Sequence, residues 1–257
     1  VKISYLRHKT NLSLFQARLT GFLAAKGIYV TTVDSDDELS EIKVNQLIKV
    51  LNQQPDVIQI GLVTGKDLST AVPNFAHTQA NEFILNGHAE IWGKLITEKK
   101  WSVVGKFYRT EFLRQILSEM NSHGKYINMA EDFALTTCLM YEAKSFYRCL
   151  GIGNYFYRAS ENSVTRNQWY SKVDSLSKYL MQYERVRLLV TEFLINKNAS
   201  ESEMDNFHLL WCSILKWVLP LFKKLLKNEE ISELFFRAFP AAYSLDYLIK
   251  TDFELAS

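Results

Sequence analysis

The sequence predicts an α/β protein, with a mostly parallel sheet flanked by helices and followed by a helical C-terminal region. Up to about residue 165, short β-branched runs alternate with helical patterns, which is typical of a largely parallel sheet. Beyond that point Leu, Tyr, Val and Phe recur at three- and four-residue spacing, as on the apolar face of helices. The composition, 47% hydrophobic and 23% charged with ten glycines and four prolines, is that of a globular protein and excludes collagen-like and disordered classes.

Strands are expected where short apolar runs end at polar or turn-forming residues. The β-branched run IYVTTV over residues 28–33 predicts a buried strand, because a buried strand shows no polar alternation. The polar stretch over residues 64–80 contains Gly65 and Pro73 and predicts a loop. The predicted strands span residues 1–6, 28–33, 57–63, 101–108 and 145–150.

The segments between these strands have helical periodicity and start signals. Asn11 or Ser13 is expected to cap the first helix, which Gly27 ends, and Asp37 is expected to cap the second. The predicted helices of this half span residues 12–26, 38–52, 110–121 and 130–144. The basic residues Lys106 and Arg109, near a predicted strand end, are expected to be solvated. We divide the chain into residues 1–165 and a helical region over 166–257.

The charge balance and the cysteines limit the class of protein and its compartment. Thirty basic and twenty-eight acidic residues leave a net charge of +2, so no nucleic-acid polymer is expected as a partner. The three cysteines, Cys138, Cys149 and Cys212, form no CxxC motif and cannot all pair with one another. This favours a reducing compartment, and we expect a cytoplasmic protein.

Three carboxylates follow the strand predicted at residues 28–33. Asp34 and Asp36 are two residues apart, so they share a face of an extended segment and could hold a hard divalent cation such as Mg²⁺ or Mn²⁺. The alternative is a solvated turn whose acids cap the next helix. A calcium loop is excluded, because its sixth and twelfth positions, counted from Asp34, hold Leu39 and Asn45 in place of Gly and Glu.

Several segments around this cluster form a further pattern: NLSLFQARLTG at 11–21, VDSDD at 33–37, WSVVGKFYRTEFL at 101–113, Glu131–Asp132, YFYR at 155–158 and SVT at 163–165. Together they resemble the family-2 glycosyltransferases. Ser13 and Leu19 depart from the family pattern, which has Gly and Asn at these places. The opening strands of the family and its DDGSxD loop have no counterpart, so we expect residues 1–165 to be a partial catalytic domain of the GT-A type, which is Rossmann-like.

The resemblance implies an inverting, metal-dependent glycosyltransferase that moves a sugar from a nucleotide-diphosphate sugar, of the UDP type, to an acceptor hydroxyl. It implies a role in cell-surface polysaccharide or lipopolysaccharide biosynthesis, with a glycan or lipid-linked acceptor. Asp36 and Asp34 would hold the divalent cation, with Asp34 also near the donor ribose. Arg18 would reach a donor phosphate or brace the acidic cluster. Arg158 would do the same or form an ion pair within the fold.

By the same resemblance Asp132 would be the catalytic base, supported by Glu131. The alternative is that both residues are acids at the start of an apolar helix, where the helix dipole favours them. A second function from another class also stays open. The chain could be a catalytically incomplete fragment or descendant that acts as a sugar- or partner-binding module, which the absence of the opening strands favours.

The C-terminal segment over residues 207–227 is rich in Leu, Trp and Phe and carries four lysines. Such a mixture is found in helices that lie on a membrane surface, and equally in helices packed on a domain with their lysines solvated. Lys216 and Pro220 interrupt its apolar run, which stays short of the roughly 18 residues that a spanning helix needs. We expect a packed helix, with peripheral contact at the inner face of the membrane as the alternative.

Overall fold

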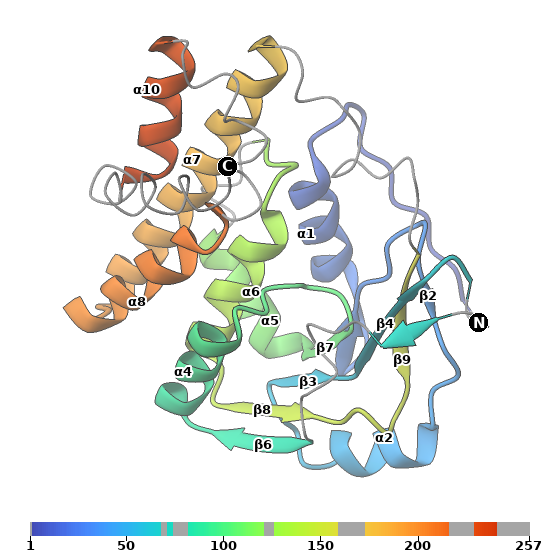
Figure 1. The fold of residues 1–257 in the computed structure, drawn as a ribbon. Coiled ribbons are helices and arrows are strands. Elements are labelled where there is room, and N and C mark those ends of the chain that lie inside the picture. The colour runs from blue at the N-terminus through green and yellow to red at the C-terminus, as the bar shows by residue number, and fades with distance from the viewer. Residues whose placement is uncertain are drawn as a thin grey trace. The chain divides into compact units, whose positions relative to one another are not determined.

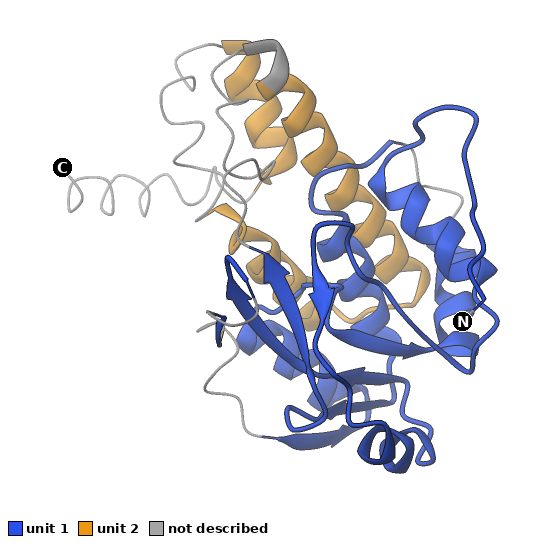
Figure 2. Cartoon of the chain, turned by 90° about the vertical axis from the view of Figure 1, so that its right-hand side faces the viewer, with its two compact units in different colours: residues 1–166 blue, residues 167–257 orange. Residues whose placement is uncertain are grey.

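The structure is a computed structural model, and it describes residues 2–67, 71–73, 82–120, 126–158, 173–215 and 229–240. The chain divides into two compact units, Val1–Arg166 and Asn167–Ser257 (Figure 2). Unit 1 holds strands and helices, whereas the described elements of unit 2 are all helices. The α/β class and the helical C-terminal region are therefore confirmed, while the assignment of residues 1–165 as a partial catalytic domain stays a prediction.

The strands of unit 1 form two sheets. The first has the order β1-β7-β3-β8-β6 and the second the order β2-β9-β4-β5. In each sheet one neighbouring pair of the described strands is parallel, β3 with β8 and β4 with β9, and all others are antiparallel. The strands are β1 (Tyr29–Thr31), β2 (Glu38–Leu39), β3 (Val57–Gln59), β4 (Gly61–Gly65), β5 (Val72–Pro73), β6 (Phe83–Asn86), β7 (Lys106–Arg109), β8 (Ser145–Arg148) and β9 (Asn154–Arg158).

The prediction of a mostly parallel sheet is wrong, since the described sheets are mixed. Alternating strands and helices give parallel neighbours only when each helix connects two adjacent strands. Here β7 enters antiparallel between β1 and β3, and β6 lies antiparallel on β8 at the edge. The pattern of the sequence shows the elements, but their order in the sheet depends on pairings between distant segments.

Four of the five helices that the structure describes in unit 1 form one layer. The helix α6 is buried along almost its whole length, and α1, α4 and α5 pack against it (Figure 1). The fifth, α2, packs Leu47 and Val50 on a small core around Ile60, Ile152 and Tyr155. The helices are α1 (Leu14–Ala24), α2 (Val44–Leu51), α4 (His88–Glu98), α5 (Thr110–Met120) and α6 (Glu131–Glu142).

Several elements begin or end where the sequence predicted them. The helices predicted at 12–26, 110–121 and 130–144 are confirmed as α1, α5 and α6, and the hydroxyl of Ser13 accepts a hydrogen bond from the amide of Gln16 as the cap of α1. The strand predicted at 57–63 is divided into β3 and β4.

Others differ from the prediction. The described residues of the predicted strand 1–6 form no strand, and Ile3 is 88% exposed. The strand at 28–33 is shortened to β1, which is only half-buried. The helix predicted at 38–52 begins at Val44 with Lys43 as its cap, so the prediction that Asp37 caps it is wrong. Glu38 and Leu39 pair instead with β9, which outweighs their local preference for a helix.

Unit 2 contains α7 (Val173–Asn196), α8 (Glu201–Cys212) and α10 (Glu229–Ala238). Ser200 and Glu203 form a reciprocal capping box at the start of α8. Trp211 donates a hydrogen bond from Nε1 to the carbonyl oxygen of Ala238 at 2.8 Å, which joins α8 to α10. Residues 216–228, with the four lysines and Pro220 of the segment predicted as a packed helix, lie outside the described residues. No helix in the described ranges is both long and apolar enough to span a membrane.

Candidate active site

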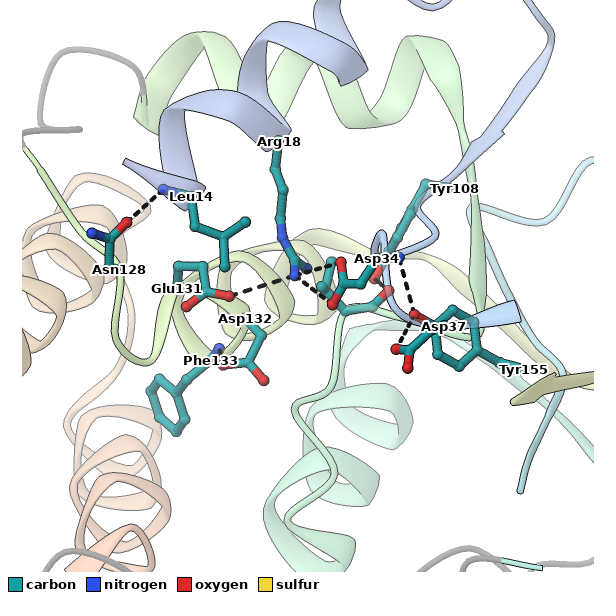
Figure 3. A network of polar contacts seen from close by, with 11 residues as sticks. Leu14, Arg18, Asp34, Asp37, Tyr108, Asn128, Glu131, Asp132, Phe133 and Tyr155 are labelled. Carbon is teal, nitrogen blue, oxygen red and sulfur yellow. Dashed lines mark hydrogen bonds and ion pairs between the residues drawn. The ribbon is translucent and has the colours of Figure 1, made fainter. Parts of the chain in front are cut away.

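An arginine on α1 holds the acidic segment that follows β1. Nη2 of Arg18, on α1, donates to Oδ1 and Oδ2 of Asp34 at 2.9 and 3.0 Å, and lies 3.6 Å from Oε1 of Glu131 (Figure 3). The side chains of Arg18 and Glu131 are 7% and 9% exposed, and that of Asp34 is 33% exposed. One buried guanidinium thus joins the strand-end acids to the start of α6.

The position of Arg18 follows from how α1 begins. The amide of Leu14 donates to Oδ1 of Asn128 at 2.6 Å, and the amide of Phe15 donates to the carbonyl oxygen of Ile127 at 3.2 Å. These bonds satisfy donors that the first turn of a helix leaves open. They also tie the first turn of α1 to the segment that leads into α6, and so keep Arg18 beside Glu131.

Glu131 and Asp132 form the first turn of α6, as predicted. Oδ1 of Asp132 accepts a hydrogen bond from the amide of Phe133 at 2.8 Å. Burial raises the pKa of Glu131, and the neighbouring Asp132 raises it further, against the opposing charge of Arg18. Burial also raises the pKa of Asp132, while Arg18 and Lys106 oppose the shift. A carboxylate with a raised pKa is a stronger proton acceptor than an ordinary aspartate.

A tyrosine that sequence patterns gave no role completes the acidic segment. The hydroxyl of Tyr155, on β9, accepts from the amide of Asp34 at 3.2 Å and donates to Oδ2 of Asp37 at 2.6 Å (Figure 3). The amide of Arg158 donates to Oδ1 of Asp37 at 2.9 Å. Asp37 is therefore a structural acceptor that orders the turn, and its pKa is raised by burial and by the charges of Asp36 and Asp34. The only sequence signal that includes Tyr155 is the YFYR segment at residues 155–158.

Arg158 adopts one of its two predicted alternatives. Its guanidinium forms an ion pair with Glu38, and both side chains are about half exposed. A role for Arg158 at a donor phosphate stays a prediction. The SVT segment at 163–165, which follows it in the family pattern, lies outside the described residues.

The two candidate metal ligands differ in their surroundings. Asp36 is exposed, whereas both carboxylate oxygens of Asp34 accept from Arg18. The described residues contain no group of three or more His, Cys, Asp and Glu side chains arranged to hold a metal. Mg²⁺ and Mn²⁺ in nucleotide sites commonly take one or two carboxylates and complete their shell with substrate phosphates and water. The oxygen donors of Asp36 and Asp34 fit a cation held in that way.

A buried lysine contributes its charge to the surroundings of Asp132. Lys106, on β7, is 1% exposed, so the prediction that it is solvated is wrong. Its ammonium donates to the carbonyl oxygen of Ser102. Arg109, predicted to be solvated as well, forms an ion pair with the buried Asp56. Successive residues of β7 point to opposite faces of the sheet, so Lys106 lies on the buried face and Arg109 on the half-buried one. The sequence alone does not show which face lies toward the core, because that depends on the neighbouring elements.

Comparisons with known proteins find partial matches to glycosyltransferases. Residues 1–127, slightly less than half of the chain, match the family model described as glycosyl transferase family 2. Over 161 residues the chain is 29% identical to the "Uncharacterized glycosyltransferase EpsJ" of Bacillus subtilis (strain 168). That match covers 62% of this chain and 45% of the relative, so the chain spans less than half the length of this relative.

Solved structures of S. aureus TarS are also similar. TarS 1–349 in complex with UDP-GlcNAc aligns with a TM-score of 0.48 and 15% identity, over 95% of this chain and 75% of TarS. TarS 1–349 in complex with UDP aligns with a TM-score of 0.42 and 16% identity, over 89% of this chain and 70% of TarS. The family match over residues 1–127 and the similarity to EpsJ support the resemblance to the family-2 glycosyltransferases.

Proposed function

We propose that this chain is part of an inverting, metal-dependent glycosyltransferase that moves a sugar from a UDP-sugar to an acceptor hydroxyl. The observation that carries the proposal is the contact of Arg18 with both Asp34 and Glu131. This contact joins Asp34, a candidate ligand on the donor side, to Glu131, whose neighbour Asp132 is the candidate base. The family match supports the reaction class.

The two sides of this network suit the two charges that develop during sugar transfer. The attacking hydroxyl must lose a proton, and Asp132, with its raised pKa, accepts it. The leaving diphosphate gains negative charge on the side of Asp34 and Asp36, where a bound Mg²⁺ or Mn²⁺ would neutralise it. Inversion follows if the hydroxyl attacks the anomeric carbon opposite the diphosphate in a single displacement.

Asp36→Ala in the complete protein is expected to weaken the binding of UDP in the presence of Mn²⁺ by at least about tenfold, because one of only two candidate ligands is lost. Without Mn²⁺, wild type and variant are expected to bind UDP equally weakly. Titration calorimetry with UDP, with and without Mn²⁺, measures both quantities.

Glu41→Ala is the matched control, because Glu41 is an exposed carboxylate on the same connection between β1 and α2. We expect it to bind UDP like wild type. Equal affinities of Asp36→Ala and wild type in Mn²⁺ would contradict the metal role of Asp36. A complete protein that binds no nucleotide-sugar donor under any of these conditions would instead favour the alternative, a binding module without transferase activity.

The acceptor is proposed to be a glycan or a lipid-linked sugar in polysaccharide synthesis, reached from the cytoplasmic side. The lysine-rich segment over residues 207–227 would then touch anionic lipid head groups, an attraction that salt screens. Flotation of the complete protein with anionic liposomes is expected to occur at low salt and to be lost at high salt. Protein that stays with liposomes after a high-salt wash would contradict a purely electrostatic contact.

A further inference from the structure

Lys106 is a buried charge that the proposed mechanism does not use. Its side chain lies within unit 1 at 1% exposure, and its ammonium donates to the carbonyl oxygen of Ser102. A buried ammonium loses its hydration, so an apolar side chain of similar length would be favoured here on grounds of stability alone. A charge in such a place is a candidate for function when other charges of a site lie near it.

Contacts connect Lys106 to the start of α6. Lys106 and Tyr108, both on β7, donate to the consecutive carbonyl oxygens of Ser102 and Val103, the latter at 3.2 Å. The ring of Trp101, at the head of the same segment, packs edge-on against Phe133 with 5.5 Å between ring centroids. The amide of Phe133 in turn donates to Oδ1 of Asp132. Strand β7 thus holds residues 101–103 against Phe133, the residue after the candidate base Asp132.

We infer that Lys106 is a positioning residue for Asp132, which it serves in two ways. It fixes the segment that packs on the first turn of α6, and its positive charge favours the ionised carboxylate that can accept a proton from the acceptor hydroxyl. This inference rests on the proposed function, because it gives Lys106 a role only if Asp132 is the base.

The direction of the pH effect follows from the charges around the two groups. Asp132 faces Glu131 of its own helix, Arg18 of α1 and Lys106 of β7. Lys106 faces Asp132, and it is repelled by Arg148 of β8 and by Lys100. Burial, with the repulsion from Arg148, lowers the pKa of Lys106 to about 7, so the ammonium is present in the acidic range. Without it the pKa of Asp132 rises, and the base is protonated up to a higher pH.

Lys106→Met tests this in the pH profile of kcat of the complete enzyme. We expect the acidic limb to move to higher pH by about one unit, which is the size of shift that a nearby opposite charge produces. The KM for the donor is expected to stay within about twofold of wild type, since Asp132 acts on the acceptor. Lys99→Met removes the charge of an exposed lysine seven residues earlier and is expected to leave the profile unchanged. An acidic limb that does not move in Lys106→Met would overturn the inference.

A second measurement leaves Lys106 in place and needs no activity. Coupling between two titrating groups is reciprocal, so Asp132→Asn must lower the pKa of Lys106 if the two charges interact. NMR of lysine-labelled protein follows this titration, with the Lys106 signal assigned by its loss in Lys106→Met. An unchanged pKa of Lys106 in Asp132→Asn would also overturn the inference. If this pKa shifts but Asp132→Asn transfers sugar at the wild-type rate, the charges interact and it is the role of Asp132 as base that fails.

Discussion

Replacing Asp132 with asparagine is expected to slow sugar transfer by about 10²–10⁴-fold, the usual contribution of a positioned general base. Asparagine keeps the shape of the side chain and can still accept the hydrogen bond from the amide of Phe133, but it cannot take up a proton. UDP binding is expected to stay within about twofold of wild type, because the donor-side acids lie on another segment. Transfer rates at saturating donor and calorimetry with UDP measure the two effects.

The control for this substitution is Glu111→Gln. Glu111 is also an acid in the first turn of a helix, α5, and its side chain is 90% exposed. Like Asp132, Glu111 interacts with the dipole at the start of its helix, but it is exposed to solvent. Replacing Glu111 is therefore expected to leave the transfer rate unchanged. If Asp132→Asn transfers sugar as fast as Glu111→Gln, then Asp132 is a helix-start acid and another group is the base.

The helices α1, α5 and α6 could be predicted because their signals are local. Each has apolar residues at helical spacing over at least ten residues, and α1 has a cap in Ser13. The sequence patterns did not predict helix α4 or strands β6 and β9. Strand β6 alternates half-buried and exposed residues over four positions, which is too short a pattern to recognise, and β9 is defined by its pairing with β2 and β4.

The candidate site could be predicted as a set of residue types but not as a network. The strand-end acids and the Glu131–Asp132 pair were recognised, and bracing of the acids was one of the two alternatives for Arg18. The hydrogen bond between Tyr155 and Asp37 joins residues 118 positions apart, and no local pattern indicates such a contact. The burial of Lys106 likewise depends on which face of β7 lies toward the core, which the sheet decides.

The second large effect is expected on stability, from Arg18→Met. The guanidinium of Arg18 faces two carboxylates, and Met fills the same volume while leaving both without their cation. Removing one partner of a buried ion pair is strongly destabilising, since the remaining charge stays away from water. We therefore expect the free energy of unfolding, measured by urea denaturation at pH 8, to fall by about 3 kcal/mol.

The loss should depend on pH in a defined direction. Burial already raises the pKa of Glu131, and without Arg18 this pKa rises further, so the folded variant keeps a proton that the unfolded chain has released. The pKa of Glu131 in folded wild type is about 8, so wild type loses stability in the same way up to that pH. The stability of the variant keeps falling up to its own higher folded pKa, and the deficit against wild type is therefore smaller at about pH 6 than at about pH 9. Arg158→Met is the control, because its exposed pair with Glu38 is worth at most about 1 kcal/mol. Equal losses for the two arginine variants, or a loss independent of pH, would show that Arg18 does not stabilise Glu131 as an ionised group.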